Sequence, residues 1–212
     1  MIITLSSLKG GTGKTSLSVH LAHAITLAGK RVILIDADPQ ASASDWAAAR
    51  DDSPPFPVVG MARDTLHRDL AAITADYDHA VIDTPPRVSA LARSAILAAD
   101  LVLIPVQPSS YDVWAAAETV KLIEEAQQFK PDIKAAFVVN RRIVNTSLGG
   151  EVAAALADYS PPVLDATIAQ RISFAEASAG YTVLEDSPKS AAANEVRSLA
   201  DNVLKFMGVE KW

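Results

Sequence analysis

The sequence predicts a single α/β domain in which a doubly wound, mainly parallel β-sheet is flanked by helices. Short apolar runs of strand length alternate with longer segments whose apolar residues follow the helical spacing. The first run, Met1–Leu5, leads into a glycine-rich stretch, and two later runs end in acidic residues. Polar loops that follow parallel strands meet at the carboxyl edge of such a sheet, where ligands bind. We therefore expect the functional site at that edge.

The expected strands are short, rich in apolar and β-branched residues, and bounded by turn residues. Pro39 ends the second strand, and Pro105 and Pro108 mark the end of a later one. In chain order the expected strands are Met1–Leu5, Val32–Ile35, Val58–Val59, Ala80–Asp83, Leu101–Val106, Ala135–Val139 and Val163–Ile168.

The expected helices lie between these strands. Gly29 suits the left-handed position that follows a helix, and Ser187-Pro188 introduces the last helix. In chain order the expected helices are Thr15–Ala28, Ser42–Ala49, Thr65–Ala75, Ser89–Ala98, Tyr111–Phe129, Ser147–Tyr159, Phe174–Ala179 and Ala191–Met207.

The composition limits the class of protein. The chain has 212 residues, of which 50% are hydrophobic, and a formal net charge of −6. We expect one domain over residues 1–212, without a separate N-terminal DNA-binding domain, and a cytoplasmic location. The acidic balance argues against a surface that is basic all over, although it permits a local basic patch. Because there is no cysteine, disulfides, cysteine-bound zinc and cysteine-held iron–sulfur clusters are excluded.

The stretch Leu8–Ser16 has the composition of a phosphate-binding loop. It reads Leu-Lys-Gly-Gly-Thr-Gly-Lys-Thr-Ser, between an expected strand and an expected helix. Backbone N–H groups in such a turn have no helical partner and point at an anion, and glycines let the backbone approach it closely. Lys14 suits the β- and γ-phosphates, and the Thr15 hydroxyl suits Mg²⁺. The usual pattern has glycine where Leu8 stands, and a second lysine, Lys9, follows here.

Acidic residues end two of the other strong strands. Asp36 and Asp38 follow the second strand, and Asp83 ends the strand that begins at Ala80. Together with the glycine-rich stretch they provide what Mg²⁺-dependent phosphoryl chemistry requires: donors and cations for phosphate, a hydroxyl for the metal, and carboxylates for bound water.

These stretches resemble the ParA/MinD family of P-loop ATPases. Lys9–Thr15 is similar to the family's deviant Walker A motif, Asp36–Gln40 to its Walker A′ motif, and Ala80–Pro86 to its Walker B motif. Leu101–Pro108 and the segment ending in Asn140-Arg141 also fit in order, so the resemblance covers nearly the whole chain. It is closest to the small ParA-type partition and positioning ATPases.

The resemblance implies a Mg²⁺-dependent ATP hydrolase with slow basal turnover. Among the catalytic residues, Lys9 would reach the partner's nucleotide across a dimer interface, Lys14 would bind phosphates in its own chain, and Asp38 would position the attacking water. The implied metal residues are Thr15, Asp36 and Asp83. The residues implied for ATP or ADP are Lys9, Gly10, Gly11, Thr12, Gly13, Lys14, Thr15 and Ser16, with Asn140 and the turn from Pro105 to Pro108 at the adenine.

The resemblance also implies partners. The ATP-bound homodimer would bind nonspecific DNA on the nucleoid, and a ParB-like or cargo-adaptor protein would stimulate hydrolysis. The cargo would be a plasmid, a chromosome or a protein compartment such as a carboxysome. Phosphate-facing cations are needed for DNA, and the candidates are Arg141, Arg142, Arg171, Lys189, Arg197 and Lys205. Among them we expect Arg171 and the pair Arg141-Arg142 to contact DNA first.

Two other functions remain open. A MinD-like ATPase that cycles on a membrane would share the ATP site, but the tail Val203–Trp212 is short and its apolar residues continue the face of the last helix, so we expect core packing and no stable membrane anchor. A metabolic P-loop ligase would not need Lys9.

Asp112, near the start of an expected helix, is expected to cap that helix. The alternative is that Asp112 lies at a dimer interface.

Overall fold

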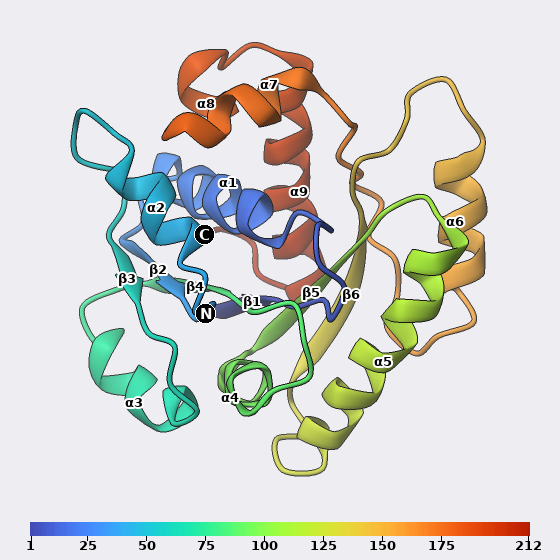
Figure 1. Ribbon diagram of the computed structural model, residues 1–212, viewed down its shortest axis with the longest axis horizontal. Coiled ribbons are helices and arrows are strands. Elements are labelled where there is room, and N and C mark those ends of the chain that lie inside the picture. Colours follow the sequence, from blue (N-terminus) through green and yellow to red (C-terminus); the bar gives the residue numbers. More distant parts are fainter.

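The computed structural model describes residues 1–212 and contains one six-stranded sheet in which every pairing is parallel (Figure 1). The strand order across the sheet is β3-β2-β4-β1-β5-β6. The strands are β1 (Ile2–Leu5), β2 (Val32–Asp36), β3 (Val58–Gly60), β4 (His79–Asp83), β5 (Leu101–Val106) and β6 (Lys134–Val139). The predicted fold class is confirmed.

The register places the polar strand ends level with one another. Leu5 pairs with Asp83 between β1 and β4, and Asp36 pairs with Asp83 between β2 and β4. The chain adds β5 and β6 on the opposite side of β1, so the loop after β1 leaves the sheet where the strand order changes direction. Ligands bind at this kind of switch point in doubly wound sheets.

Helices cover both faces of the sheet (Figure 1). One face carries α1 and α9, with the short α2, α7 and α8 beside them; the other carries α3, α4 and α5, and α6 packs near β6 and α5. The helices are α1 (Lys14–Leu27), α2 (Ser42–Ala48), α3 (Leu66–Ile73), α4 (Ala90–Ala98), α5 (Ser110–Gln127), α6 (Leu148–Leu156), α7 (Ile172–Glu176), α8 (Val183–Asp186) and α9 (Ala191–Met207), with a 3₁₀ turn at Ala177–Ala179.

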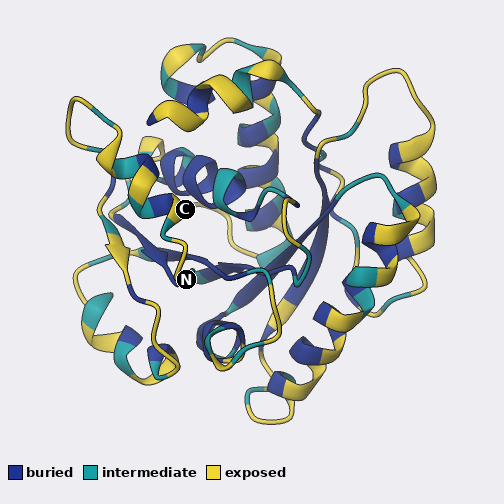
Figure 2. Cartoon of the chain, in the orientation of Figure 1, coloured by how far each residue is buried: buried dark blue, intermediate teal, exposed yellow.

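The core lies in two layers between the helices and the sheet, as the dark strands and inward helix faces in Figure 2 show. Leu17 and Leu21 of α1 pack with Leu199 and Val203 of α9 in one layer. On the opposite face, residues such as Ile123 of α5 pack against β5 and β6. Burial of apolar surface on both faces explains why the strands read as continuous apolar runs.

The expected strand at Val163–Ile168 is wrong. This segment runs beside β6, where Leu164 N–H donates to Phe137 O and Ile168 N–H donates to Val139 O, but the pairing amounts to an isolated bridge between Val163 and Phe137 and no continuous ladder. The ladder is interrupted because the Ala166 N–H donates to Asn202 Oδ1 on α9 instead of to β6.

The sequence interpretation also missed α8. Thr182 and Glu185 form a capping box at its start, the spacing that marks a helix N-terminus in sequence.

The carboxyl-terminal tail packs on the domain as expected. Phe206, Met207 and Trp212 lie against the apolar layer formed by α1, α9 and the sheet. None of the helices has the length and apolar character needed to cross a membrane.

Candidate nucleotide site

The glycine-rich loop, Leu8–Ser16, presents free backbone donors. None of the N–H groups from Lys9 to Ser16 donates a hydrogen bond within the chain. Side chains hold the loop's carbonyls instead: Gln107 Nε2 donates to Gly11 O at 2.8 Å, and Asn140 Nδ2 donates to Thr12 O at 2.7 Å. Carbonyls turned toward the protein and free amides at a helix N-terminus form an anion cradle.

Gly13 is required by the geometry of this loop. Its φ is +90°, and a Cβ built there would lie 2.3 Å from Asn140 Nδ2. Asn140 therefore fixes the loop and excludes any side chain at position 13. The Asn140 Oδ1 atom accepts a hydrogen bond from the Arg141 N–H, so both ends of the amide serve the protein scaffold.

The charges of Lys14 and Asp83 shift each other's pKa values. Burial lowers the pKa of Lys14, while the charges of Asp83 and Asp38 oppose that shift. Burial raises the pKa of Asp83 to about 7, helped by the charges of Asp36 and Asp38 and opposed by a hydrogen bond from Thr15 and the charge of Lys14. A buried carboxyl with such a raised pKa is a site where bound cations gain stability.

The pair Thr15–Asp83 fits a magnesium ion. Thr15 Oγ1 donates to Asp83 Oδ2 at 2.6 Å, and Ser18 Oγ donates to Asp83 Oδ1 at 3.3 Å. The structure contains no group of three or more His, Cys, Asp or Glu residues that would hold a metal by themselves. A hydroxyl and a carboxylate fit Mg²⁺ because this ion keeps waters and phosphate oxygens among its ligands.

Asp36 and Asp38 are brought to the same edge but differ in environment. Asp36 accepts hydrogen bonds from Ser44 N at 2.8 Å and Ser44 Oγ at 2.9 Å, which anchor α2 to the end of β2. Asp38 is half-buried and lines the same hollow as Lys14. Asp38 is the only acidic residue that lines this hollow, so it alone among the acids is placed to contact a water there.

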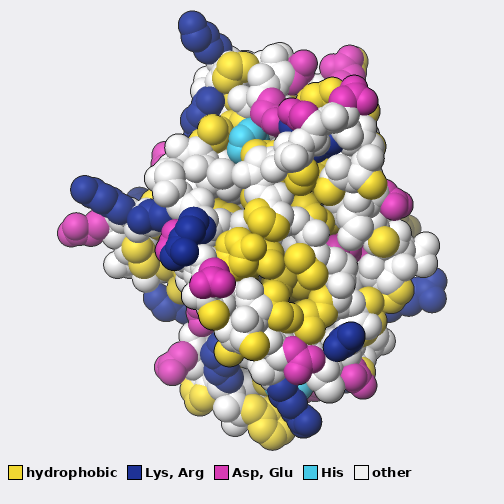
Figure 3. Space-filling view, turned by 90° about the vertical axis from the view of Figure 1, so that its left-hand side faces the viewer, with side chains coloured by type: hydrophobic (Ala, Val, Ile, Leu, Met, Phe, Trp, Pro, Cys, Tyr) yellow, Lys and Arg dark blue, Asp and Glu magenta, His cyan; other side chains and the backbone are white.

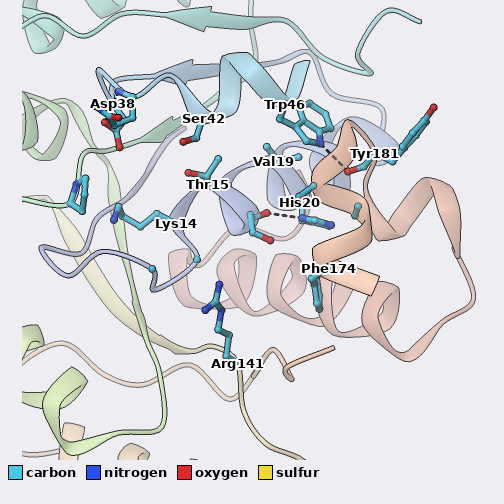
Figure 4. Close-up of a pocket in the computed structure, with 17 residues that line it drawn as sticks. Lys14, Thr15, Val19, His20, Asp38, Ser42, Trp46, Arg141, Phe174 and Tyr181 are labelled. Atoms are coloured by element: carbon cyan, nitrogen blue, oxygen red, sulfur yellow. Dashed lines mark hydrogen bonds between the residues drawn. The ribbon is translucent and has the colours of Figure 1, made fainter. Parts of the chain in front are cut away.

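Two hollows adjoin the glycine-rich loop. The first, of about 480 Å³, extends from Lys14 and Thr15 toward Trp46 and Tyr181 (Figure 4). The second, of about 470 Å³, is lined by Asn140 and the segment around Gln170. Both are large enough for parts of a nucleotide. They share five lining residues, namely Gly13, Ser16, Arg141, Phe174 and Ser178.

The structure does not bring all predicted nucleotide residues together. Pro105 lies inside β5 and is buried, and Pro108 lines a separate hollow with Val113 and Trp114. Neither proline lines the hollows beside the glycine-rich loop. Thr12 is buried, and its Oγ1 has no hydrogen-bond partner.

Lys9 is paired within its own chain. Its Nζ forms an ion pair with Asp112 Oδ2 on the first turn of α5. The Asp112 side chain is 4% exposed, and its Oδ1 is buried without a partner. The expectation that Asp112 caps α5 is therefore wrong, because its carboxylate is committed to the lysine rather than to backbone N–H groups.

The candidate DNA-binding residues differ in whether their side chains already have partners within the chain. Arg171 forms two hydrogen bonds with Glu195, Arg142 Nε donates to Thr167 Oγ1 at 3.1 Å, and Arg197 donates to Asn194 Oδ1. Lys189, Lys205 and Arg141 are exposed and form no ion pair.

Sequence reasoning missed two residues that shape the site. Gln107, within Pro-Val-Gln-Pro, holds the loop carbonyl of Gly11. His20 is buried, and its Nδ1 contacts Ser16 O at 2.7 Å while the Val183 N–H donates to its Nε2 at 3.1 Å. A polar residue directly after a strand was a signal for Gln107, whereas nothing in the local sequence indicated the partners of His20.

A parallel sheet with a phosphate cradle after β1 and acidic ends on β2 and β4 defines a P-loop nucleotide-binding protein. The CobQ/CobB/MinD/ParA nucleotide binding domain family matches residues 3–182. The chain belongs to this family, and the predicted kinship with ParA/MinD-type ATPases is confirmed. It is accordingly an ATPase of that class.

Curated relatives match over almost their full length. The chain is 28% identical over 207 residues to the "Maintenance of carboxysome distribution protein A" of Halothiobacillus neapolitanus, covering 95% of each chain. It is 29% identical over 235 residues to the "Chromosome-partitioning ATPase Soj" of Thermus thermophilus, covering 95% of this chain and 94% of that protein.

Among solved structures, the chain resembles the septum site-determining protein MinD of Pyrococcus horikoshii, complexed with Mg-ADP. The TM-score is 0.80 at 22% identity, over 98% of this chain and 97% of that one. At this identity the likeness concerns the fold.

Proposed function

We propose that this ATPase binds Mg²⁺ with ATP or ADP, forms a sandwich dimer in the ATP state, binds DNA without sequence preference, and positions or segregates a cargo. The observation that carries the proposal is Lys9, a second lysine on a loop that already has Lys14 in its cradle. Two nucleotides that face each other concentrate negative charge, and a lysine supplied by each chain offsets that charge. Dimerisation then reports the presence of ATP.

Within one chain, different residues have different roles in ATP hydrolysis. The free amides of the glycine-rich loop and Lys14 bind and orient the phosphates. Thr15 and Asp83 are the side chains that would hold Mg²⁺, which supplies charge stabilisation at the phosphates when bound. Asp38 positions the attacking water from the rim of the hollow. A lone carboxylate is a weak general base, so we expect slow basal turnover that a partner protein accelerates.

The names of the relatives support a class of cargo. Their names refer to carboxysome distribution and chromosome partitioning. A plasmid, a chromosome or a protein compartment such as a carboxysome is therefore the cargo we propose, with a ParB-like or cargo-adaptor protein as the partner. The chain would act in the cytoplasm and associate with the nucleoid in its ATP state.

The DNA-binding surface must be local because the formal net charge is −6. The face shown in Figure 3 bears apolar side chains at its centre, and Lys and Arg are mixed with Asp and Glu around them. Lys189 and Lys205, exposed and without ion pairs, are the better candidates, whereas the Arg171–Glu195 pair makes Arg171 a weaker one. Nonspecific DNA binding depends on such unpaired cations.

DNA retention in the two nucleotide states tests this proposal. With ATP the purified protein should shift a random-sequence duplex, and the shift should weaken as salt is raised. With ADP it should bind weakly. Equal weak binding in both states would contradict nucleotide-gated DNA binding. ATP-dependent cosedimentation with liposomes, in place of DNA retention, would favour the MinD-like alternative instead.

A further inference from the structure

Arg141 occupies a constrained turn directly after β6. Its φ is +54°, a left-handed conformation that is unfavourable for a residue with a Cβ. Asn140 Oδ1 accepts the Arg141 N–H at 2.9 Å, and the next residue, Arg142, donates its N–H to Ile168 O at 2.9 Å. Hydrogen bonds on both sides therefore hold the turn in this conformation, as is common where a side chain must be aimed at a site.

The turn directs Arg141 toward the glycine-rich loop. Arg141 lines the first hollow, where Figure 4 shows it below Lys14, and it also lines the second. Gly13 and Ser16 line both hollows as well. Its guanidinium forms no ion pair, whereas that of Arg171 is paired with Glu195. An arginine without a counter-ion, beside a row of free backbone amides, suits a phosphate because its planar fork matches the phosphate oxygens.

We propose that Arg141 binds the nucleotide at the α-phosphate, on the Ser16 side of the loop, and does not belong to the DNA surface. Lys14, whose Nζ lies near Lys9 O, serves the opposite end of the loop, where the terminal phosphates belong. Arg141 and Lys14 thus hold the two ends of the phosphate chain. The inference rests on nucleotide binding by this loop, and not on dimerisation or DNA binding.

Calorimetric titration with Mg-ADP and with a non-hydrolysable ATP analogue tests the assignment. Arg141→Gly is the main variant because glycine accepts the positive φ, so the turn should keep its shape. It should lower the affinity for both nucleotides by the same factor, about tenfold, which is the loss expected for a charge-assisted contact. Arg141→Lys should give an intermediate loss, since it keeps the charge without the fork. Lys121→Ala, at an exposed position of α5 away from both hollows, is the control and should leave both affinities unchanged.

DNA retention at saturating nucleotide separates this inference from the DNA proposal. Arg141→Gly should retain DNA as the wild type does once the nucleotide site is filled. Wild-type nucleotide affinity in Arg141→Gly, or a loss of DNA retention alone, would overturn the assignment. A loss confined to the ATP analogue would place the contact at the terminal phosphate and overturn the α-phosphate role.

Discussion

The ion pair between Lys9 and Asp112 opposes any role of Lys9 in a second molecule. To reach a partner's nucleotide, Lys9 must leave a carboxylate whose side chain is 4% exposed. Leaving a buried polar group unpaired costs about 1–3 kcal/mol. In the proposed cycle the pair would therefore set a threshold that ATP binding must overcome before dimerisation.

Asp112→Asn should lower that threshold. The amide keeps the shape of the side chain but removes the charge that holds Lys9, so half-maximal dimerisation should need several-fold less ATP, as measured by light scattering after size exclusion. Glu118→Gln, at an exposed position of the same helix, should leave the midpoint unchanged. An unchanged or higher midpoint in Asp112→Asn would show that the pair does not restrain Lys9.

We expect Asp83 to make magnesium binding dependent on pH. Burial raises its pKa to about 7, so below that pH the carboxyl of the metal-free protein is protonated and Mg²⁺ must displace the proton. The apparent Mg²⁺ affinity, measured by titration at saturating nucleotide, should rise up to about tenfold per pH unit below pH 7 and level off above it. Asp45→Asn, at an exposed acid on α2, should keep this profile. A flat profile between about pH 6 and 7 would contradict the raised pKa.

At the scale of elements, His20 couples the glycine-rich loop to α8. Ser16 O accepts from His20 Nδ1, and the Val183 N–H donates to Nε2, so both ring nitrogens are used only in the neutral form. Burial lowers the pKa of His20 to about 4. Protonation breaks the contact with α8, and stability is therefore expected to fall in acid.

The sign of this effect follows from the two pKa values. The unfolded chain binds the proton near pH 6.5, the folded chain only near pH 4, so the contribution is complete above about pH 6.5 and is lost as pH falls toward 4. The loss is about 3 kcal/mol at most. Urea unfolding of wild type and His20→Asn should show a smaller acid-induced decrease in the variant. Equal decreases would exclude His20 as a source, leaving His23 and His79, whose pKa values are also lowered by burial.

The elements also show what the sequence can predict. The strands that carry the site were predictable because they are buried on both faces and are therefore mostly apolar, with Thr4 as a buried polar residue in β1. Val163–Ile168 is partly apolar, with Asp165 and Thr167 among its six residues, and its pairing with β6 depends on Asn202, far away in sequence. The residue types of the site were predictable from the loop after β1 and the acids after β2 and β4. Their partners, such as Asp112 for Lys9 and Asn140 for the loop, depend on contacts between distant elements.

At the scale of the whole molecule, the fold brings three features to one edge of the sheet: a phosphate cradle, a candidate cation site and a second lysine, Lys9. The cradle and the cation site can be completed within one chain. Lys14 lines the first hollow beside the glycine-rich loop, whereas Lys9 lines neither hollow and is paired with Asp112. In the proposed cycle a second copy of the chain would supply the phosphate group for Lys9, and this is the central claim of that proposal.

Light scattering of an Asp38→Ala protein, with and without Lys9→Ala, tests this claim most directly. Asp38→Ala should prevent hydrolysis, so the protein with ATP should remain a dimer, whereas with ADP it should be a monomer. Adding Lys9→Ala should leave ATP binding in place through Lys14 but yield a monomer with either nucleotide. An ATP-dependent dimer that persists without Lys9 would contradict the account.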